Sequence, residues 1–395
     1  MRDGLIDIFM AGVRRADPVA AVTGALTDVA RPDAILAVGK AAGAMSRAAL
    51  ARFPGVPCLV VTNPENAAEI AGAEVILGGH PVPDDGSERA GTALLDWAGR
   101  LGSGQRALVL ISGGGSALAV APVAGVSLAD KAEVSRQLLS AGLDIRAMNL
   151  VRQSLSRIKG GGLARALAPA TGTALILSDV VGDDLSAIAS GPCVPPLGPP
   201  EQAVALLRRE GLWERLPESC RVALAQAQPV ETPAMETRLI GSNRLSAEAM
   251  AAAAPGAVLD PVPLEGDVAE AAARVARAAA PGTRLWGGET TVVLRGSGRG
   301  GRNQELALRV ALALEGVGRP WAFLSGGTDG RDGPTDAAGA LVDDGTLARA
   351  RAAGIDVAAR LAENDSYPVL QATGDLLITG GTGTNVADLQ ILRMG

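Results

Sequence analysis

The sequence predicts an α/β protein of two domains, the first a doubly wound, Rossmann-like sheet of mostly parallel strands. The chain has 395 residues, which is more than one ordinary core accommodates. Its 51 glycines and 24 prolines, with only 2% aromatic residues, indicate many tight connections around an aliphatic core. Short apolar runs alternate with segments of helical period, which is typical of parallel sheets that bind ligands at the carboxyl ends of their strands.

The elements of the first half follow one another in regular alternation. The apolar runs that predict parallel strands are residues 34–38, 58–62, 73–77, 108–111 and 174–177. The segments of helical period between them include residues 40–51, 86–98, 128–140 and 145–158. Because strand–helix–strand crossovers are right-handed, this order favours helices on both faces of one sheet.

A cluster of prolines between residues 192 and 236 marks a change in composition around a pair of short helices. We place the domain boundary there, which gives a first domain of residues 1–235 and a second of residues 236–395. The second half continues with a strand at 237–242, an alanine-rich helix at 268–280 and strands at 284–286, 290–294 and 321–325. This alternation predicts a second, smaller α/β domain.

Composition excludes several classes of function. The net charge of -6, with no basic stripe interleaved with aromatic residues, argues against nucleic acid as a partner. The apolar segments are strand-sized and the first residues lack an apolar signal core, so we expect a cytoplasmic protein without a membrane span. Cys58, Cys193 and Cys220 show no metal or redox spacing, and the single histidine, His80, makes zinc hydrolysis an unsuitable mechanism.

Lysine is scarce, because the chain has only three. Lys40 follows a predicted strand in a glycine-containing turn, where a cation and a helix amino end can handle an anion. A lysine at a helix start is also commonly a solvated surface charge, so both interpretations stay open. Lys159 precedes three glycines at a predicted helix end, where a cation complements the helix dipole.

A second turn of the same kind contains Ser112, Gly113, Gly114, Gly115 and Ser116. It follows a buried strand and precedes a helix, so several backbone N–H groups can converge on one oxyanion. The alternative is an ordinary tight loop with a serine cap.

The densest glycine loop, Gly296 to Gly301, opens a helix at Arg302 and has the G-x-G-x-x-G spacing of a dinucleotide site. Such a site needs an acidic residue at the end of the next strand, roughly 20 positions on. That strand ends instead in Ser325 and Gly326. The loop therefore suits delivery of Arg302, a fork-shaped donor, to a phosphate or carboxylate.

Acidic side chains follow predicted strands at Asp179, Glu289 and Asp329. Carboxylates at strand ends can hold Mg²⁺ through one or two oxygens and leave the other positions to water and substrate. Local turn formation uses the same residue types and is the competing explanation. Asp179 is the preferred metal candidate, because it lies directly beyond a near-continuous apolar strand.

Taken together, several segments resemble the class II glycerate 2-kinases, whose carboxyl-terminal half is called the MOFRL domain and whose members carry the older label hydroxypyruvate reductase. The segments are residues 37–45, 112–118, 151–164, 177–192, 287–308, 327–339 and 378–389. The similarity runs in order over nearly the whole chain.

The resemblance implies transfer of the γ-phosphoryl group of ATP to the 2-hydroxyl of D-glycerate, giving 2-phosphoglycerate and ADP in a cleft between two α/β domains. The lysine and arginine thought to be catalytic in the family match Lys40 and Arg302. Ser112 to Ser116 would hold an anionic group, and Asp179 or a neighbouring carboxylate would orient Mg²⁺, another divalent cation or the hydroxyl. The expected partners are glycerate and ATP, and a homodimer stays open.

Two alternatives remain at this point. One is an NAD(P)H-dependent hydroxypyruvate reductase, which the spacing of Gly296 to Gly301 and the older family label support. The other is a non-catalytic sensor of sugar phosphates that has kept the anion-binding turns.

Overall fold

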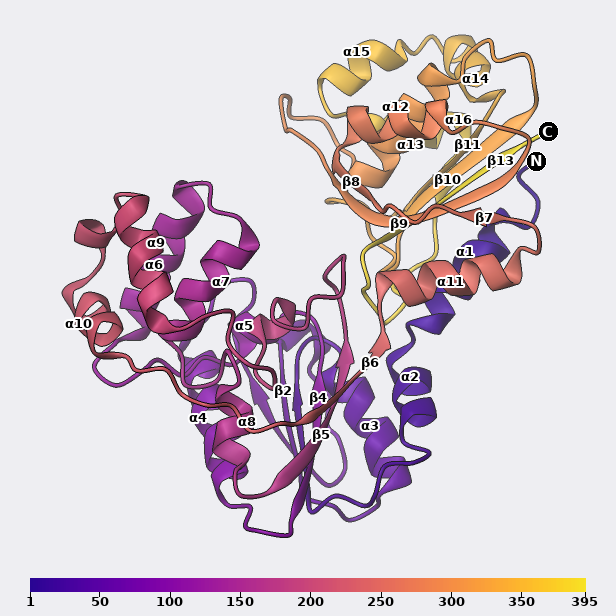
Figure 1. Cartoon of the computed structure of the whole chain (residues 1–395). Helices are drawn as coiled ribbons and strands as arrows, with labels where there is room; N and C mark the ends of the chain where they lie inside the picture. The colour runs from indigo at the N-terminus through magenta and orange to yellow at the C-terminus, as the bar shows by residue number, and fades with distance from the viewer. The chain divides into compact units, whose positions relative to one another are not determined.

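The computed structural model describes every residue, Met1–Gly395 (Figure 1). The chain forms two compact units, one of Pro18–Ile240 and one that combines Met1–Asp17 with Gly241–Gly395. The main division lies near the predicted boundary, whereas the first 17 residues belong to the carboxyl-terminal unit and not to the first domain.

The Pro18–Ile240 unit contains a six-stranded sheet in the order β3-β2-β1-β4-β5-β6. The strands are β1 (Ala34–Val38), β2 (Cys58–Thr62), β3 (Ala73–Leu77), β4 (Arg106–Ile111), β5 (Thr171–Leu177) and β6 (Glu236–Gly241). The pairs from β3 to β5 are all parallel. The order reverses between β1 and β4, which makes the carboxyl ends of these two strands the topological switch point of a doubly wound fold.

Helices cover both faces of this sheet, as predicted (Figure 1). Helices α2 (Pro18–Ala25) and α3 (Ala42–Arg52) lie on one face, and α4 (Asp85–Gly99) and α8 (Gly162–Leu167) lie on the other. All residues of β4 after Arg106 are buried, because each face of the strand meets a helical layer.

Four further helices form a small cluster beside the sheet (Figure 1). They are α6 (Leu128–Ser140), α7 (Ile145–Ser154), α9 (Pro200–Arg209) and α10 (Glu218–Gln226), and they share a core that includes Leu138, Val151 and Leu207. The helix predicted to reach residue 158 ends at Ser154, because Ser156 pairs with Pro122 as an isolated bridge. The short elements are α5 (Gly115–Leu118), η1 (Pro64–Asn66), η2 (Ile188–Ser190) and η3 (Trp213–Arg215).

The other unit contains a mixed, seven-stranded sheet in the order β12-β11-β10-β13-β9-β7, with β8 paired to β9. The strands are β7 (Val258–Leu259), β8 (Leu264–Asp267), β9 (Gly282–Thr291), β10 (Trp321–Gly327), β11 (Gly339–Asp343), β12 (Leu376–Leu377) and β13 (Asp388–Met394). Strand β13, the last of the chain, lies between β9 and β10 and is antiparallel to both.

The two strands predicted at 284–286 and 290–294 belong to one strand, β9, which ends at Thr291, so residues 292–294 lie outside it. Residues Gly287 and Gly288 continue its pairing with β13, and Glu289 pairs with Glu265 of β8. The prediction that Glu289 follows the end of a strand is therefore wrong, because cross-strand pairing keeps this glycine-rich segment extended and places Glu289 within β9.

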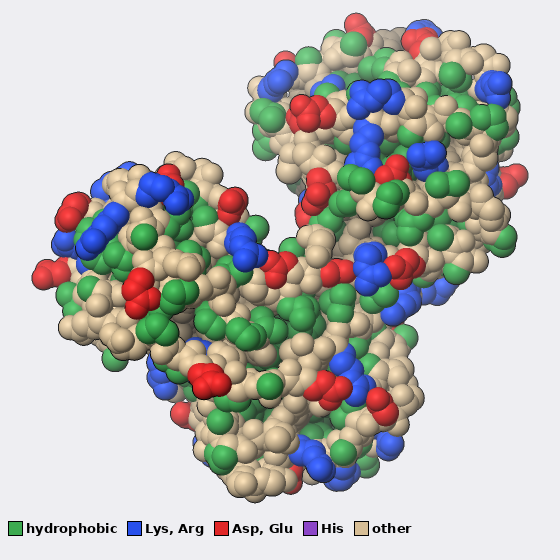
Figure 2. All heavy atoms as spheres, viewed as in Figure 1, with side chains coloured by type: hydrophobic (Ala, Val, Ile, Leu, Met, Phe, Trp, Pro, Cys, Tyr) green, Lys and Arg blue, Asp and Glu red, His purple; other side chains and the backbone are tan.

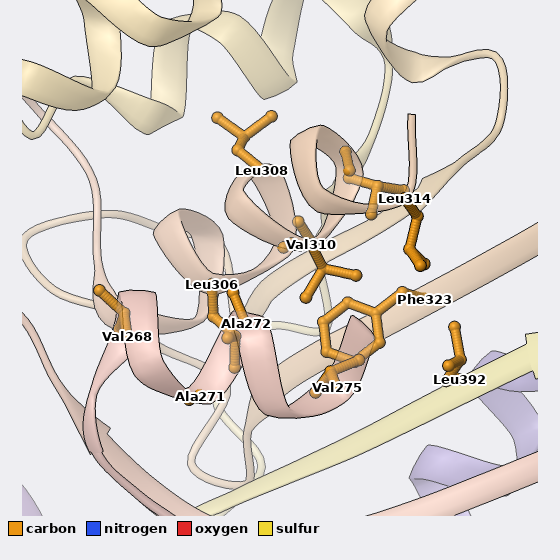
Figure 3. Close-up of a cluster of buried hydrophobic side chains, with 14 of the residues drawn as sticks. Val268, Ala271, Ala272, Val275, Leu306, Leu308, Val310, Leu314, Phe323 and Leu392 are labelled. Carbon is orange, nitrogen blue, oxygen red and sulfur yellow. The ribbon is translucent and has the colours of Figure 1, made fainter. Parts of the chain in front are cut away.

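Two helical layers enclose this second sheet (Figure 1). On one side lie α12 (Val268–Arg277), α13 (Arg302–Ala313), α14 (Thr346–Ala352), α15 (Val357–Ala362) and α16 (Ser366–Thr373). Figure 3 shows the core of this side, where Val275 of α12 and Val310 of α13 lie around the ring of Phe323 from β10. Helices α1 (Leu5–Arg15) and α11 (Asn243–Ala253) cover the other face.

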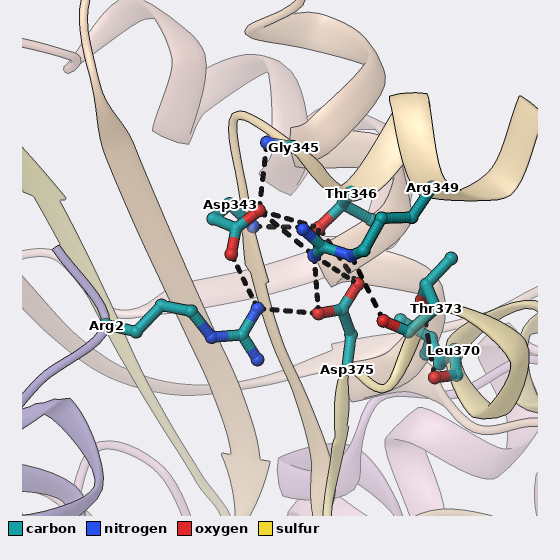
Figure 4. Close-up of polar contacts among 8 residues, drawn as sticks. All are labelled: Arg2, Asp343, Gly345, Thr346, Arg349, Leu370, Thr373 and Asp375. Atoms are coloured by element: carbon teal, nitrogen blue, oxygen red, sulfur yellow. Dashed lines mark hydrogen bonds and ion pairs between the residues drawn. The ribbon is translucent and has the colours of Figure 1, made fainter. Parts of the chain in front are cut away.

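The first residues belong to the carboxyl-terminal unit because the apolar side chains of α1 are buried in its core. Leu5 and Phe9 are fully buried in a core that they share with Met250 of α11 and Leu324 of β10. Ahead of the helix, one Arg2 nitrogen lies 2.7 Å from an oxygen of Asp343 and 2.6 Å from an oxygen of Asp375 (Figure 4). Apolar packing and these ion pairs together hold the amino terminus to the carboxyl-terminal unit.

On the face drawn in Figure 2, acidic and basic side chains are interspersed and no continuous basic surface appears. No helix combines the length and apolar character that a membrane crossing requires.

Candidate functional site

Lys40 lies in the turn between β1 and α3, at the switch point of the first sheet. Gly39 before it has φ +131°, and a Cβ atom there would lie 2.1 Å from Oγ of Ser112, so the turn requires glycine. The N–H of Lys40 donates to the carbonyl of Gly113 at 2.9 Å, and the N–H of Ala41 donates to Oγ of Ser112 at 3.0 Å. The turn after β1 is thus hydrogen-bonded to the turn after β4.

The turn from Ser112 to Ser116 leads from β4 into α5 and brings further groups to the same place. A Cβ atom on Gly114 would lie 3.2 Å from Cγ of Lys40 and 3.1 Å from Cδ2 of His80. The N–H groups of Gly113 to Ser116 donate to no acceptor within the protein. Such a run of unpaired amides is the usual basis of an anion site at a strand-to-helix turn.

Asp179 lies beyond β5 on the other side of this turn. A Cβ atom on Gly113 would lie 2.1 Å from Oδ2 of Asp179, so the carboxylate touches the glycine turn directly. Burial raises the pKa of Asp179, while the positive charge of Lys40 acts in the opposite direction. The structure therefore brings Lys40, the Ser112 to Ser116 turn and Asp179 together at one sheet edge.

His80 lies beside Lys40 at this edge. Burial lowers the pKa of His80, and the charge of Lys40 lowers it further, while Glu65 acts in the opposite direction. The imidazole is accordingly neutral at pH 7 and is available as a hydrogen-bonding group beside Lys40.

Arg302 is the first residue of α13 and contacts two carboxylates in the carboxyl-terminal unit. Its Nε and Nη2 donate to the two oxygens of Asp388 at 2.7 and 2.9 Å, and its Nη1 lies 2.8 Å from Oε1 of Glu289. Burial lowers the pKa of Arg302, but Asp388 and Glu289 outweigh it and the net shift is upward. The guanidinium is therefore held in one orientation and stays charged.

Asp329 lies close to this pair, just beyond β10. Burial raises the pKa of Asp329, and the nearby Asp388 raises it further, while Arg302 lowers it. Arg302, Glu289 and Asp329, three residues that the sequence singled out separately, thus form one charged group in the carboxyl-terminal unit. Lys40, the Ser112 to Ser116 turn and Asp179 all belong to the Pro18–Ile240 unit.

The amino end of α13 is already occupied by a carboxylate of the chain itself. Asp332 accepts hydrogen bonds from the N–H groups of Asn303 and Gln304 at 3.1 and 2.9 Å. Burial raises the pKa of Asp332 to about 6, although these two amides act in the opposite direction. A dinucleotide site uses this helix end for the pyrophosphate, so Asp332 stands where that ligand would bind.

The glycine loop ahead of α13 is also engaged within the chain. The N–H of Gly298 donates to the carbonyl of Glu363 at 2.9 Å, and the N–H of Arg299 donates to Oδ1 of Asp365 at the same distance. These contacts explain the close spacing of glycines by packing, and the G-x-G-x-x-G match does not mark a cofactor loop.

Sequence reasoning missed Asp388, the partner of Arg302. Its only sequence signal is an acidic residue at the start of an apolar run, and its side chain is fully buried. Sequence reasoning also misplaced Lys159, which does not lie at a helix end: α7 ends at Ser154, and Nζ of Lys159 donates to the carbonyl of Ser116 at 2.9 Å.

The chain has no group of three or more His, Cys, Asp or Glu side chains placed to hold a metal ion. A single carboxylate such as Asp179 beside an anion-binding turn still fits Mg²⁺, which takes most of its ligands from water and phosphate. The residues present therefore suit a cation that arrives with a nucleotide better than a cation enclosed by the protein.

Comparisons with known proteins agree with this arrangement. Residues 4–225 match a family described as a domain of unknown function (DUF4147), and residues 283–388 match the MOFRL family. A D-glycerate 2-kinase from Thermotoga maritima is 38% identical over 375 residues, covering 90% of this chain and 89% of that protein. The chain belongs to the class II glycerate 2-kinase family.

Other members of the family are similarly close. A crystal structure of glycerate kinase from Thermotoga maritima matches with a TM-score of 0.94 and 36% identity, covering 100% of this chain and 99% of that one. A protein from Agrobacterium vitis, provisionally named a hydroxypyruvate reductase, is 43% identical over 420 residues and covers 100% of this chain and 94% of its own length. The predicted family and fold class are confirmed, and the roles of the individual site residues stay predictions.

Proposed function

We propose that this protein is an ATP-dependent glycerate 2-kinase, which transfers the γ-phosphoryl group of ATP to the 2-hydroxyl of D-glycerate and releases 2-phosphoglycerate and ADP. The observation that carries the proposal is the arrangement at the switch point of the first sheet. A lysine, a turn with four unpaired amides and a carboxylate meet there, in a chain whose relatives over most of its length include two glycerate 2-kinases.

Phosphoryl transfer requires little covalent chemistry from a protein, because the protein mainly aligns the reacting groups and neutralises charge on the transferring oxygens. Lys40 and the amides of Gly113 to Ser116 supply positive charge and hydrogen-bond donors for this purpose. Arg302 supplies a planar fork of donors, which Asp388 and Glu289 hold in place. We assign both cations to stabilisation of the transferring phosphoryl group.

Asp179 is the residue that would hold Mg²⁺ in this site. When bound with ATP, Mg²⁺ neutralises charge on the phosphate oxygens. The carboxylate of Asp179 is partly buried and touches the glycine turn, so it lies where it could contact a cation bound to phosphate. Glu289 forms an ion pair that helps to fix the guanidinium of Arg302, and Asp329 contributes negative charge close to it.

The reductase alternative lacks a supporting observation in the structure. Its sequence evidence was the spacing of Gly296 to Gly301, and the helix end that this spacing would present to a dinucleotide is capped by Asp332. The sensor alternative predicts no turnover, so a measured rate decides against it.

The cysteines support a reducing compartment, and we propose the cytoplasm. Cys58, Cys193 and Cys220 are all free and buried. Burial raises the pKa of Cys193 to about 12, and burial also raises the pKa of Cys58 to about 11. These thiols remain protonated and act as small apolar core residues.

The test is a pair of assays on the purified full chain. ADP release that depends on D-glycerate, with the product identified by phosphorus NMR as the 2-phosphate, is the expected result. NADH oxidation with hydroxypyruvate in the absence of ATP would instead establish the reductase. A 3-phosphate product would overturn the position of transfer and leave the kinase assignment standing.

A further inference from the structure

All three lysines of the chain lie around the turn from Ser112 to Ser116, although arginine is the usual cation elsewhere. Lys40 bonds to this turn through its backbone, as described above. Nζ of Lys159 donates to the carbonyl of Ser116 at 2.9 Å and also to Oγ of the same serine. Lys131 lines a pocket together with Ser116 and Lys159.

Lys131 and Lys159 form a basic cluster with Arg152, in which no member has a carboxylate partner. Lys131 is 9% exposed and Lys159 is 3% exposed, and Arg152 is partly buried. Nζ of Lys131 donates to the carbonyl of Leu155 at 3.0 Å, and Nη2 of Arg152 donates to Oγ of Ser116 at 2.9 Å. Buried cations are normally paired with acids, because an unpaired buried charge is costly. This cluster therefore lacks the anion that would balance it.

The pocket beside the cluster has a volume of about 330 Å³ and lies within the Pro18–Ile240 unit, between α6, α7 and the start of α5. Apolar side chains form its other walls, among them Val82, Val120, Leu139 and Met148. Val82 is 70% exposed and Leu139 is 65% exposed, so apolar surface is available at the pocket itself. The volume lies in the range of cofactor sites and far exceeds what a three-carbon acid fills.

We propose that this pocket is the ATP site, with the polyphosphate chain bound by Lys131, Arg152 and Lys159 and the adenine ring against the apolar wall. The inference rests on the proposed kinase function and specifies which residues hold its nucleotide. Ser116 belongs both to the pocket and to the glycine turn, so a polyphosphate on the cluster lies next to the turn that accepts a hydrogen bond from the backbone of Lys40.

The choice of lysine in the cluster has a physical reason. Burial lowers the pKa of Lys131 to about 7, with Arg152 acting in the same direction and Cys220 opposing it. Burial also lowers the pKa of Lys159, and the charges of Arg152 and Lys131 add to this effect. Lysine can lose its proton when the pocket is empty, whereas arginine cannot. An arriving polyphosphate restores the charge, so nucleotide binding is expected to take up protons.

The test is calorimetric binding of a non-hydrolysable ATP analogue with Mg²⁺ to the full chain, in the absence of glycerate. We expect Lys131→Met and Arg152→Met each to raise the dissociation constant about 10-fold or more, as loss of a charge-assisted hydrogen bond does. Arg146→Met is the matched control, because Arg146 lies on the same helix as Arg152, is 70% exposed and does not line the pocket. Its affinity should change less than about twofold.

Two further arms identify which part of the nucleotide is bound. Inorganic tripolyphosphate should lose affinity in the lysine and arginine variants as the analogue does, and adenosine should not. At pH 8, titrations in buffers of different ionisation enthalpy should show proton uptake in the wild type and less in Lys131→Met. Lys131→Met replaces a buried amino group by an apolar side chain of similar length, so its fold, checked by circular dichroism, is expected to remain intact.

The outcomes separate this inference from the function on which it rests. Unchanged analogue affinity in folded Lys131→Met and Arg152→Met overturns the pocket assignment, even where the wild type phosphorylates glycerate. Loss of glycerate affinity with unchanged nucleotide affinity also overturns it and makes the cluster a carboxylate site. Variant-sensitive nucleotide binding without any glycerate turnover supports the pocket and refutes the kinase.

Discussion

The carboxylate of Asp388 holds the guanidinium of Arg302 through two hydrogen bonds, of 2.7 Å to Nε and 2.9 Å to Nη2. Asp388 is fully buried at the start of β13, and Arg302 is the first residue of α13. A paired fork of this kind fixes the plane of the guanidinium as well as its position. The orientation of the arginine therefore depends on a strand 86 positions further along the chain.

Arg302→Ala is expected to lower kcat about 10²- to 10³-fold, as removal of a donor to developing charge does. The KM for ATP should stay within about threefold if the arginine acts mainly in the transition state. Steady-state kinetics measures both constants, and thermal unfolding is the control for the fold. Turnover within about twofold of the wild type would remove Arg302 from the reaction.

Asp388→Asn keeps the size of the side chain and removes the charge that positions Arg302. We expect kcat to fall about 10-fold or more while the KM for glycerate changes little, because the guanidinium loses one of its two fixed acceptors. Asp388→Glu should recover part of the rate. Equal loss of rate in both variants, with a lower unfolding temperature in each, would indicate a purely structural role.

Lys40→Met should lower kcat by roughly 10²-fold or more and leave the circular dichroism spectrum unchanged. The backbone of Lys40 makes the bond to Gly113, and the substitution keeps it. Lys40→Arg, which retains the charge, is the matched variant and is expected to be less impaired. A kcat that survives in Lys40→Met would contradict the proposed contact with the phosphoryl group.

Phe323→Ala should destabilise the carboxyl-terminal unit by about 3–5 kcal/mol, because it removes a fully buried ring at the centre of the core in Figure 3. Trp286 and Trp321 belong to the same core, so their fluorescence during urea unfolding reports this unit once Trp97 and Trp213 of the other unit are replaced by phenylalanine. Val317→Ala, at a side chain that is 41% exposed, is the control and should change stability by less than about 0.5 kcal/mol. Similar losses in both variants would show that the core is not packed as described.

Asp332 gives the carboxyl-terminal unit a distinctive dependence on pH. Burial raises the pKa of Asp332 to about 6, above the 3.8 of an ordinary aspartate, so the folded state binds the proton more tightly than the unfolded chain does. The free energy of unfolding should therefore fall as pH rises from about 4 to about 6, by up to about 3 kcal/mol, and then level off. Urea titrations of the wild type and Asp332→Asn across this range test it. The variant should lack this slope, and parallel curves would refute the shift.

Much of the first unit followed from local pattern. The run from Ala34 to Val38 is apolar at every position, as a strand buried on both faces must be, and glycine follows it where φ is +131°. Because parallel strands end at a common edge, the turns holding Lys40, Ser112 and Asp179 were expected to converge. The positions of these turns in the sequence therefore predicted that the three residues lie at one edge of the sheet.

Other features depended on contacts between segments far apart in the chain. The local sequence does not indicate that β13 lies between β9 and β10. It also does not indicate that Arg2 pairs with Asp343 and Asp375 of the carboxyl-terminal unit, because the next part of the chain belongs to the Pro18–Ile240 unit. Lys131 likewise has the sequence context of an ordinary surface helix, and only the packing of α6 and α7 brings it beside Arg152 and Ser116.

The amino-acid sequence by itself determined the layer architecture, the family and the glycine turns, because hydrophobic period and backbone freedom act over a few residues. The tertiary structure alone decided which charges meet, with Asp388 on Arg302, Asp332 on the amino end of α13, and two lysines with Arg152 around one pocket. Charged side chains interact when they are close in space, and the packing of strands and helices that are far apart in the sequence brings them close.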